Sequence, residues 1–340
     1  MVTGATGLVG SHLLCHLARP GEAIIALKRE ESRIEETMAL FSRYFSSPEE
    51  AASRVTWVVG DVLDEGSLLS CVEKVDTVYH CAAMVSFNGS DRHTLMQTNI
   101  RGTENICALC LQWGVRLCFV SSIAALGDAP DESVAIDENT PEIPGSVHSL
   151  YSGSKGASEK IVWEYVGRGL NAVIVNPAII LGTGLRGRSS AKLFEQVRKG
   201  MPFYTDGVNG YVDVRDVCEA MIRLTETSSI RGERFVLCGG NYSYKELFTV
   251  IACAAGKRVP YIRMAPWMTS LAWRLLAFVS WFTRKKPAFT RETARSSQNK
   301  SRYSSAKLLK ALPDFRFHTL EETADSFGIC KIFSWVYISC

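Results

Sequence analysis

Three features of the 340-residue sequence predict an α/β fold built on a doubly wound parallel sheet. Short apolar runs of the kind expected for buried strands recur at 23–27, 55–59, 75–80, 117–120 and 235–238. A helical segment such as 103–113 lies between successive runs, so strands and helices alternate. Gly4, Gly7 and Gly10 form a turn between the first apolar residues and an apolar helical run.

Composition and charge argue against several classes of protein. The chain is 46% apolar and 21% charged, which is ordinary for a globular protein, and its net charge of +3 gives no electrostatic basis for binding nucleic acid. Eleven scattered cysteines fit a reducing compartment better than a disulfide framework, so we expect a cytoplasmic protein. Glycines arrive too early for a secretory signal. Only Met1 and Val2 precede Thr3, and we expect the natural strand to begin upstream.

The three glycines have separate roles in a dinucleotide-binding turn. Gly4 permits a tight turn out of a strand, and Gly7 lets a pyrophosphate approach the backbone. Gly10 lets the following helix pack close to the sheet, with its N-terminus toward the phosphates. Alone this run is a weak signal, because a glycine-rich turn without a ligand has the same pattern.

Lys28 and Arg29 follow the second apolar run and bear on the choice of cofactor. A cation at this position accepts the 2′-phosphate of NADP, whereas an NAD site has a carboxylate there. Glu30 and Glu31 come after the basic pair, and a solvated charge cluster is the alternative interpretation. We expect NADP, with NAD as the alternative.

Small and acidic residues follow the next two apolar runs. Asp61 can accept a hydrogen bond from the adenine amine, and Asp64 is placed to cap the next helix. The run 81–83, Cys-Ala-Ala, leaves room for a cofactor to lie flat. We expect His80 to pack at its strand end rather than to bind a ligand.

Tyr151 and Lys155 follow a strand that ends in Ser121 and Ser122. Their i, i+4 spacing puts the phenol and the ammonium on one helix face. Nearby positive charge lowers the pKa of a tyrosine, which suits the phenol to acid–base work near neutral pH. A YxxxK pattern is common by chance, but its position after a serine-ended strand argues against chance here.

With these residues in place, the chain resembles the extended short-chain dehydrogenase/reductase family, the NAD-dependent epimerase/dehydratases. Matching segments occur in the family's order over about residues 1–240: TGATGLVG (3–10), GDVLD (60–64), HCAA (80–83), NIRGT (99–103), VSSIAALG (120–127), YSGSK (151–155), NPAIILGTG (176–184) and YVDVRDV (211–217). The resemblance implies a Rossmann-type domain, with Tyr151 as the catalytic acid/base. It implies that Lys155 holds the nicotinamide ribose and that Ser122 polarises the substrate carbonyl.

The expected contacts combine the turn, the strand ends and the catalytic helix. For the cofactor they are Gly4, Thr6, Gly7, Leu8, Val9, Gly10, Lys28, Arg29, Asp61, Val62, Cys81, Ala82, Ala83, Asn99, Ser121, Tyr151, Lys155, Pro177, Ile179 and Ile180. For the substrate they are Ser86, Phe87 and Ser122, and we expect no metal.

Departures from the family pattern narrow the reaction. Ile123 and Ala124 stand where related dehydratases have an acidic pair, and Leu126 stands where many epimerases have tyrosine. Asn176, before a proline, is closer to the dihydroflavonol reductase and 3β-hydroxysteroid dehydrogenase branch. We therefore expect an NADP-dependent carbonyl reductase or alcohol dehydrogenase for a mainly apolar small molecule. A nucleotide-sugar epimerase with bound NAD and a non-catalytic NADP-sensing protein are the alternatives.

The domain boundaries follow from the motifs. We expect a cofactor domain at 1–181, to which 211–238 returns, a substrate-binding region at 182–210 and 239–326, and a tail at 327–340 of unknown role. Loops at 127–147 and 182–210 would form the pocket wall and a lid. The segments 243–255, 301–312 and 320–326 are predicted helices.

An apolar run at 266–282 has three interpretations: a buried pocket helix, an interfacial membrane helix or a membrane span. As a pocket helix it would bury Trp267, Leu271, Leu275 and Phe278. A membrane role would instead use Trp273 and Trp281 beside the basic run 284–286. Peripheral membrane contact through 266–286 and a homodimer therefore both stay open.

Overall fold

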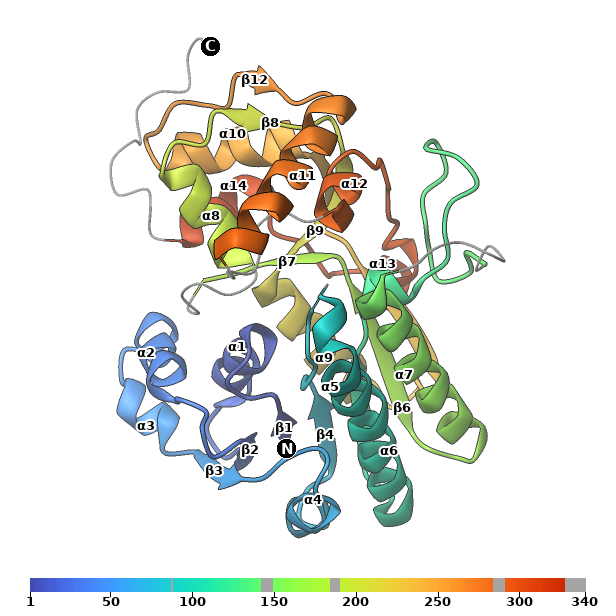
Figure 1. The fold of residues 1–340 in the computed structure, drawn as a ribbon. Helices are drawn as coiled ribbons and strands as arrows, with labels where there is room; N and C mark the ends of the chain where they lie inside the picture. The colour runs from blue at the N-terminus through green and yellow to red at the C-terminus, as the bar shows by residue number, and fades with distance from the viewer. Residues whose placement is uncertain (87, 142–148, 184–189, 284–290, 328–340) are drawn as a thin grey trace.

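The computed structural model describes residues 1–86, 88–141, 149–183, 190–283 and 291–327, without the side chains of 190–192, 277–283 and 291–293. Its main feature is a seven-stranded parallel sheet with the strand order β10-β6-β5-β4-β1-β2-β3 (Figure 1). The strands are β1 (Val2–Thr3), β2 (Ile24–Lys28), β3 (Val55–Val59), β4 (Thr77–His80), β5 (Arg116–Val120), β6 (Ala172–Pro177) and β10 (Glu233–Leu237).

The strand order reverses beside β1. From β1 the chain builds outward to β2 and β3, then returns to β4 on the other side of β1 and continues through β5 and β6. Thr3 pairs with His80 in this parallel register. Ligands of open α/β sheets bind beyond the carboxyl ends of the strands at such a reversal. The predicted fold class is confirmed, and its site is expected above β1 and β4.

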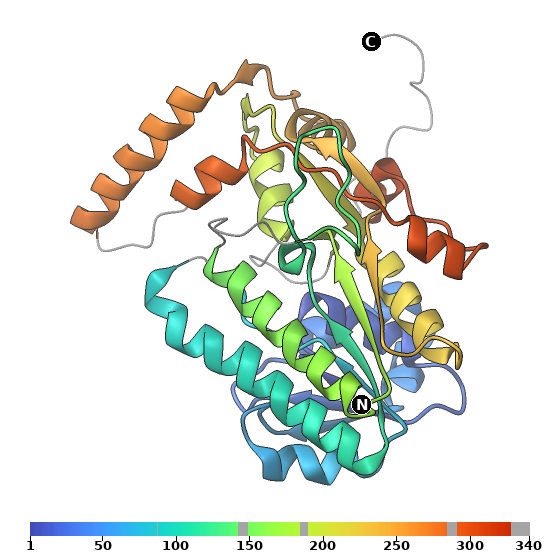
Figure 2. The same cartoon turned by 90° about the vertical axis from the view of Figure 1, so that its right-hand side faces the viewer.

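Helices cover both faces of the sheet, as Figure 2 shows. One face carries α1 (Leu8–Leu17), α2 (Glu35–Tyr44), α3 (Pro48–Ala52) and α9 (Val214–Glu226). The other carries α4 (Glu65–Val72), α5 (Arg92–Met96), α6 (Gly102–Trp113) and α7 (Leu150–Gly167). The short 3₁₀ helices η1 (Gly89–Asp91) and η3 (Ile123–Ala125) and the π-helix η2 (Gln97–Arg101) complete this half. Helix α9 packs against α1, and β10 pairs with β6, so residues from late in the sequence join the first half of the molecule.

A second, smaller region lies above the carboxyl edge of the sheet (Figure 1). It contains the sheet β11-β9-β7 and the pair β12-β8, none of which the sequence predicted. Its strands are β7 (Ile179–Leu181), β8 (Phe203–Tyr204), β9 (Val208–Asp213), β11 (Gly240–Ser243) and β12 (Ile262–Arg263). Its helices are α8 (Ser190–Arg198), α10 (Tyr244–Ala254), α11 (Pro266–Thr283), α12 (Arg291–Ser296), α13 (Ala306–Ala311) and α14 (Leu320–Ser326). The interval 182–210 thus holds a helix and two strand segments rather than only a loop.

Two predictions about the C-terminal half are wrong. The helix expected at 301–312 begins only at Ala306, because Tyr303 forms a bridge with Ile136 and Ser305 bonds to the backbone of Cys238. The apolar face of α11 is not buried: Trp267 is 68% exposed, Leu271 50% and Leu275 57%. The fourth predicted member, Phe278, and Trp281 have side chains outside the described set, as do residues 284–286 and 328–340.

Candidate active site

The turn between β1 and α1 requires glycine at two positions. Gly4 has φ +63°, and a Cβ there would lie 2.7 Å from the backbone of Ala82. A Cβ on Gly10 would lie 2.3 Å from the Gly4 carbonyl oxygen. Gly7 starts α1 without a side-chain cap, and the first turn holds no acidic residue. Glycines at these two positions let the turn, the start of α1 and the backbone of Ala82 pack closely, and this leaves uncapped helix N–H groups that fit the pyrophosphate of a dinucleotide.

His80 joins the two central strands. Its Nδ1 shares a 2.7 Å hydrogen bond with Thr3 Oγ1, and its Nε2 lies 3.3 Å from Thr103 Oγ1. Burial, with the charge of Lys155 acting in the same direction, lowers the pKa of His80 to about 3. Thr3 Oγ1 also accepts from the Ala82 backbone N–H at 3.2 Å. His80 is thus a neutral packing residue that fixes the 81–83 segment next to the glycine turn.

A cleft of about 370 Å³ opens beyond β2 and β3, where the adenosine end of a dinucleotide would lie. Its lining contains one cation and four carboxylates: Arg29, Glu30, Glu31, Val59, Gly60, Asp61, Asp64 and Ser67. Arg29 Nε lies 3.1 Å from Glu31 Oε1, with both side chains exposed. Lys28 ends β2 and does not line this cleft. Asp64 caps α4 by accepting from Gly66 N at 3.1 Å, as predicted.

The catalytic candidates meet where β5 ends. Tyr151, in the first turn of α7, is hydrogen-bonded to Ser122, which follows β5. Lys155, one turn further along α7, is 3% exposed and its Nζ donates to Val120 O at 2.8 Å. The ammonium also lies 5.3 Å from the centre of the Phe119 ring. Tyr151 and Lys155 of α7 thus both contact the residues at the end of β5, Ser122 and Val120.

The pKa values of this trio differ from the sequence-based expectation. Burial raises the pKa of Tyr151, while the hydrogen bond from Ser122 acts in the opposite direction. The expectation that Lys155 lowers this pKa is wrong for the structure, because the ammonium is directed to the Val120 carbonyl beneath the site. Burial lowers the pKa of Lys155 itself to about 8, although Cys81 and Glu159 act to raise it.

Glu159, which the sequence analysis missed, anchors a buried network behind this site. Its Oε2 accepts from Ser121 Oγ at 2.6 Å and from Asn176 Nδ2 at 2.8 Å. Its Oε1 accepts from Arg234 Nη1 at 2.9 Å. Asn176 Nδ2 also donates to the Ser122 carbonyl at 3.0 Å. The i, i+4 step from Lys155 to Glu159 on α7 was the signal that could have found it.

Asn99 links the loop after β4 to the catalytic helix. Its Oδ1 accepts from Met84 N at 2.7 Å, and its Nδ2 donates to Met84 O at 3.0 Å and Ser154 Oγ at 2.9 Å. Nearby, Ser86 Oγ donates to Asp91 at 2.7 Å, while Phe87 lies outside the described residues. The side chain of Asn99 thus fixes the backbone of Met84, two residues before the predicted substrate contact Ser86.

The other predicted contacts also lie along the carboxyl edge of the sheet. Thr6, Leu8 and Val9 are half-buried at the start of α1. Pro177 is buried at the end of β6, and Ile179 and Ile180 are half-buried just after it, whereas Val62 is only 6% exposed.

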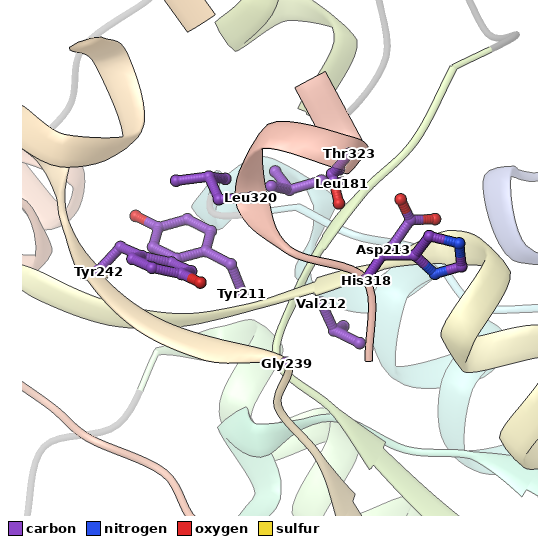
Figure 3. Close-up of a pocket in the computed structure, with 9 residues that line it drawn as sticks. All are labelled: Leu181, Tyr211, Val212, Asp213, Gly239, Tyr242, His318, Leu320 and Thr323. Atoms are coloured by element: carbon purple, nitrogen blue, oxygen red, sulfur yellow. The ribbon is translucent and has the colours of Figure 1, made fainter. Parts of the chain in front are cut away.

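A separate hollow lies beside β9, lined by Tyr211, Tyr242 and His318 among others (Figure 3). It encloses only about 10 Å³, room for a single water. Among the described residues, no cluster of His, Cys, Asp or Glu could hold a metal ion.

Comparison with known proteins shows which family the chain belongs to. The profile of the NAD dependent epimerase/dehydratase family matches residues 1–238. The chain belongs to this family. It is therefore an NAD(P)-dependent oxidoreductase of the extended short-chain dehydrogenase/reductase type.

Two curated relatives of this oxidoreductase cover most of it. A putative dihydroflavonol 4-reductase of Synechocystis is 27% identical over 321 residues, 92% of this chain and 88% of the relative. Sterol demethylase protein B of Methylococcus capsulatus is 29% identical over 272 residues, 78% of this chain and 77% of the relative.

Solved structures share the same fold. The crystal structure of gox2253 has a TM-score of 0.77 at 27% identity, covering 96% of each chain. The UDP-glucose 4-epimerase of Thermus thermophilus in complex with NAD has a TM-score of 0.70 at 23% identity, covering 96% of this chain and 98% of its own.

Proposed function

We propose that the protein is an NADP(H)-dependent reductase that converts a carbonyl of a mainly apolar small molecule to the alcohol, or catalyses the reverse. The observation on which this rests is the contact of Tyr151 with Ser122 above the buried Lys155, at the sheet edge where the glycine turn opens. The apolar character of the substrate is supported by relatives named for a dihydroflavonol and a sterol, not by α11.

In this proposal the chain's residues position and protonate the substrate. A bound nicotinamide cofactor supplies the hydride. Ser122 Oγ donates a hydrogen bond to the carbonyl oxygen, and the Tyr151 hydroxyl gives that oxygen its proton. Lys155, which is buried one turn along α7 from Tyr151, holds the nicotinamide ribose. The described parts of 182–210 and 239–326, together with Ser86, form the substrate side of the site.

Arg29 is the residue that favours NADP. Its guanidinium is exposed at the adenosine cleft, and its partner Glu31 is exposed as well, so exchanging that carboxylate for a 2′-phosphate costs little. A phosphate carries more charge and offers bidentate geometry to the guanidinium. Glu30, Asp61 and Asp64 in the same cleft favour the ribose hydroxyls of NAD instead, which makes the cofactor ratio a direct test.

The acid-rich cleft also supports a second function, a nucleotide-sugar epimerase with retained NAD. An epimerase returns its hydride to the same substrate and therefore consumes no cofactor. Ile123 and Ala124 occupy η3 beside Ser122, so an acidic pair for dehydration is missing from that turn.

A panel of aromatic, sterol-like and aliphatic carbonyl compounds, assayed for NADPH and NADH oxidation, tests the proposal. We expect carbonyl-dependent oxidation of NADPH with a higher kcat/KM than for NADH. Purification with tightly bound NAD⁺, together with C4 epimerisation of a UDP-sugar and no net cofactor consumption, would establish the epimerase instead.

A further inference from the structure

A run of exposed large apolar side chains follows one side of α11. Trp267, Leu271 and Leu275 repeat at i, i+4 and i+8, with exposures of 68%, 50% and 57%, and Leu276 beside them is 41% exposed. We call these four residues the α11 apolar face. Tyr261, just before β12, is also 68% exposed. Such a run of large exposed apolar side chains marks a contact site rather than an ordinary surface.

The rest of the helix is held from its other side. Thr269, about half a turn around the helix from Trp267 and Leu271, is 3% exposed. Gln298, which follows α12, donates to Met264 O at 2.9 Å just before α11 begins. Helix α12 packs against α11, while α11 extends away from the body of the protein (Figure 2). The α11 apolar face is therefore presented outward by a helix whose position is fixed by other contacts.

Charge identifies the kind of partner. Residues 247–291 contain no Asp or Glu, and they contain eight cations: Lys257, Arg258, Arg263, Arg274, Arg284, Lys285, Lys286 and Arg291. The whole chain has an excess of only +3, so the remainder of the molecule carries −5 (3 − 8). Lys257, Arg258 and Arg274 are exposed, whereas Arg263 is paired with Asp206. Along the sequence, exposed apolar side chains and an excess of cations therefore fall in one stretch, and Arg274 lies on α11 itself.

We propose that the α11 apolar face docks on an anionic lipid surface, with the helix lying in the plane of the membrane interface. Apolar insertion and attraction to acidic headgroups act together at such a surface. No helix in the described part of the chain is long and apolar enough to span a bilayer, and Arg274 in the middle of α11 fits a helix that lies on the surface. A second copy of the chain is a poorer partner, because a two-fold contact through this face would bring like charges together.

This membrane proposal differs in one respect from the sequence-based alternative. That alternative required Trp273 and Trp281, but Trp273 is half-buried, with the Arg274 guanidinium 5.2 Å from its ring centre. Trp267 is the residue that the structure exposes.

Flotation of the full chain with vesicles tests the proposal without reference to the substrate. We expect binding to vesicles of phosphatidylcholine mixed with phosphatidylglycerol, and little binding to phosphatidylcholine alone. Trp267→Ser combined with Leu271→Ser should reduce the partition coefficient by about tenfold or more, from lost apolar insertion. Lys257→Glu combined with Arg258→Glu should reduce it by a similar factor and weaken its dependence on salt.

Two controls match these changes elsewhere on the surface. Trp113→Ser removes a 46% exposed tryptophan at the end of α6, and Lys74→Glu with Lys310→Glu makes the same change in charge at exposed positions outside 247–291. Both controls should float like the unaltered protein. Absence of flotation, or equal losses in controls and test variants, would overturn the proposal. So would a dimer that Trp267→Ser dissociates in a protein that does not bind vesicles, since that result assigns the face to a second copy.

Discussion

Gly10→Ala is the sharpest test of the dinucleotide turn. The new methyl carbon would lie 2.3 Å from Gly4 O, 2.8 Å from Gly4 C and 2.9 Å from Ala5 Cα, all of them backbone atoms that cannot rotate away. Ordinary contact begins at 3.4 Å, so α1 and the turn must separate by about 1.1 Å (3.4 − 2.3). Overpacking of this kind costs about 1–3 kcal/mol of folding stability.

The same displacement moves the start of α1 away from the pyrophosphate position. Hydrogen bonds to charged groups contribute about 1.5–3 kcal/mol each, so the loss of one or two weakens cofactor binding by roughly 10²-fold. Calorimetric titration with NADPH measures this loss, and thermal unfolding measures the stability cost.

Gly167→Ala is the matched control, because a Cβ there meets no atom within 4 Å in α7. It should bind NADPH normally and gain about 0.5–1 kcal/mol of stability. A Gly10→Ala protein that binds NADPH within threefold of the unaltered chain would refute the assignment of this turn to the pyrophosphate.

Three further predictions concern the cofactor cleft and the buried charges. Arg29→Ser should weaken the binding of NADPH by about 1–3 kcal/mol and leave the binding of NADH nearly unchanged, while Glu31→Ser should strengthen the binding of NADPH relative to NADH. Equal binding of the two cofactors by the unaltered chain and by both variants would contradict this prediction. Lys155→Met should gain stability relative to the unaltered chain at pH 7. The pKa of Lys155 is about 8 in the folded protein and 10.5 ordinarily, so the free energy of unfolding of the unaltered chain should rise by on the order of 3 kcal/mol between pH 8 and 10.5. If the stabilities of the unaltered chain and Lys155→Met instead depend on pH in the same way across that range, the ammonium is not buried as a charge. Glu159→Gln should leave Arg234 without its carboxylate partner and lower the free energy of unfolding by about 1–3 kcal/mol. Because Glu159 raises the pKa of Lys155, the same substitution should move the basic limb of the pH profile of kcat to lower pH. If that limb does not move, the role of Glu159 is only structural.

The sequence predicted the cofactor half of the molecule well for a physical reason. Buried parallel strands are short and apolar, and their carboxyl ends lie at one edge of the sheet. Gly4, Asp61 and Ser122 come just after such strands, and Tyr151 lies in the helix that follows Ser122, so the sequence predicts that they lie near one another. The local constraint on Gly10 is equally visible, because a helix that packs on a turn leaves no room for a Cβ.

What could not be predicted depends on contacts between distant segments. Arg234 forms an ion pair with Glu159, which lies 75 residues earlier in the sequence, and no local spacing predicts that pair. Burial raises the pKa of Tyr151, and the i, i+4 spacing of Tyr151 and Lys155 does not show how deeply the phenol is buried. Helix α11 has the same apolar stripe whether it faces a core or the outside, so periodicity alone gave the wrong burial for Trp267.

The most direct test of the proposed chemistry is the single-turnover rate of carbonyl reduction by Tyr151→Phe with saturating NADPH. The substitution removes the proton donor and keeps the ring, so we expect a rate reduced by roughly 10²-fold or more with NADPH affinity little changed. A Tyr151→Phe enzyme that retains more than half of the unaltered rate would contradict the assignment of Tyr151 as the proton donor.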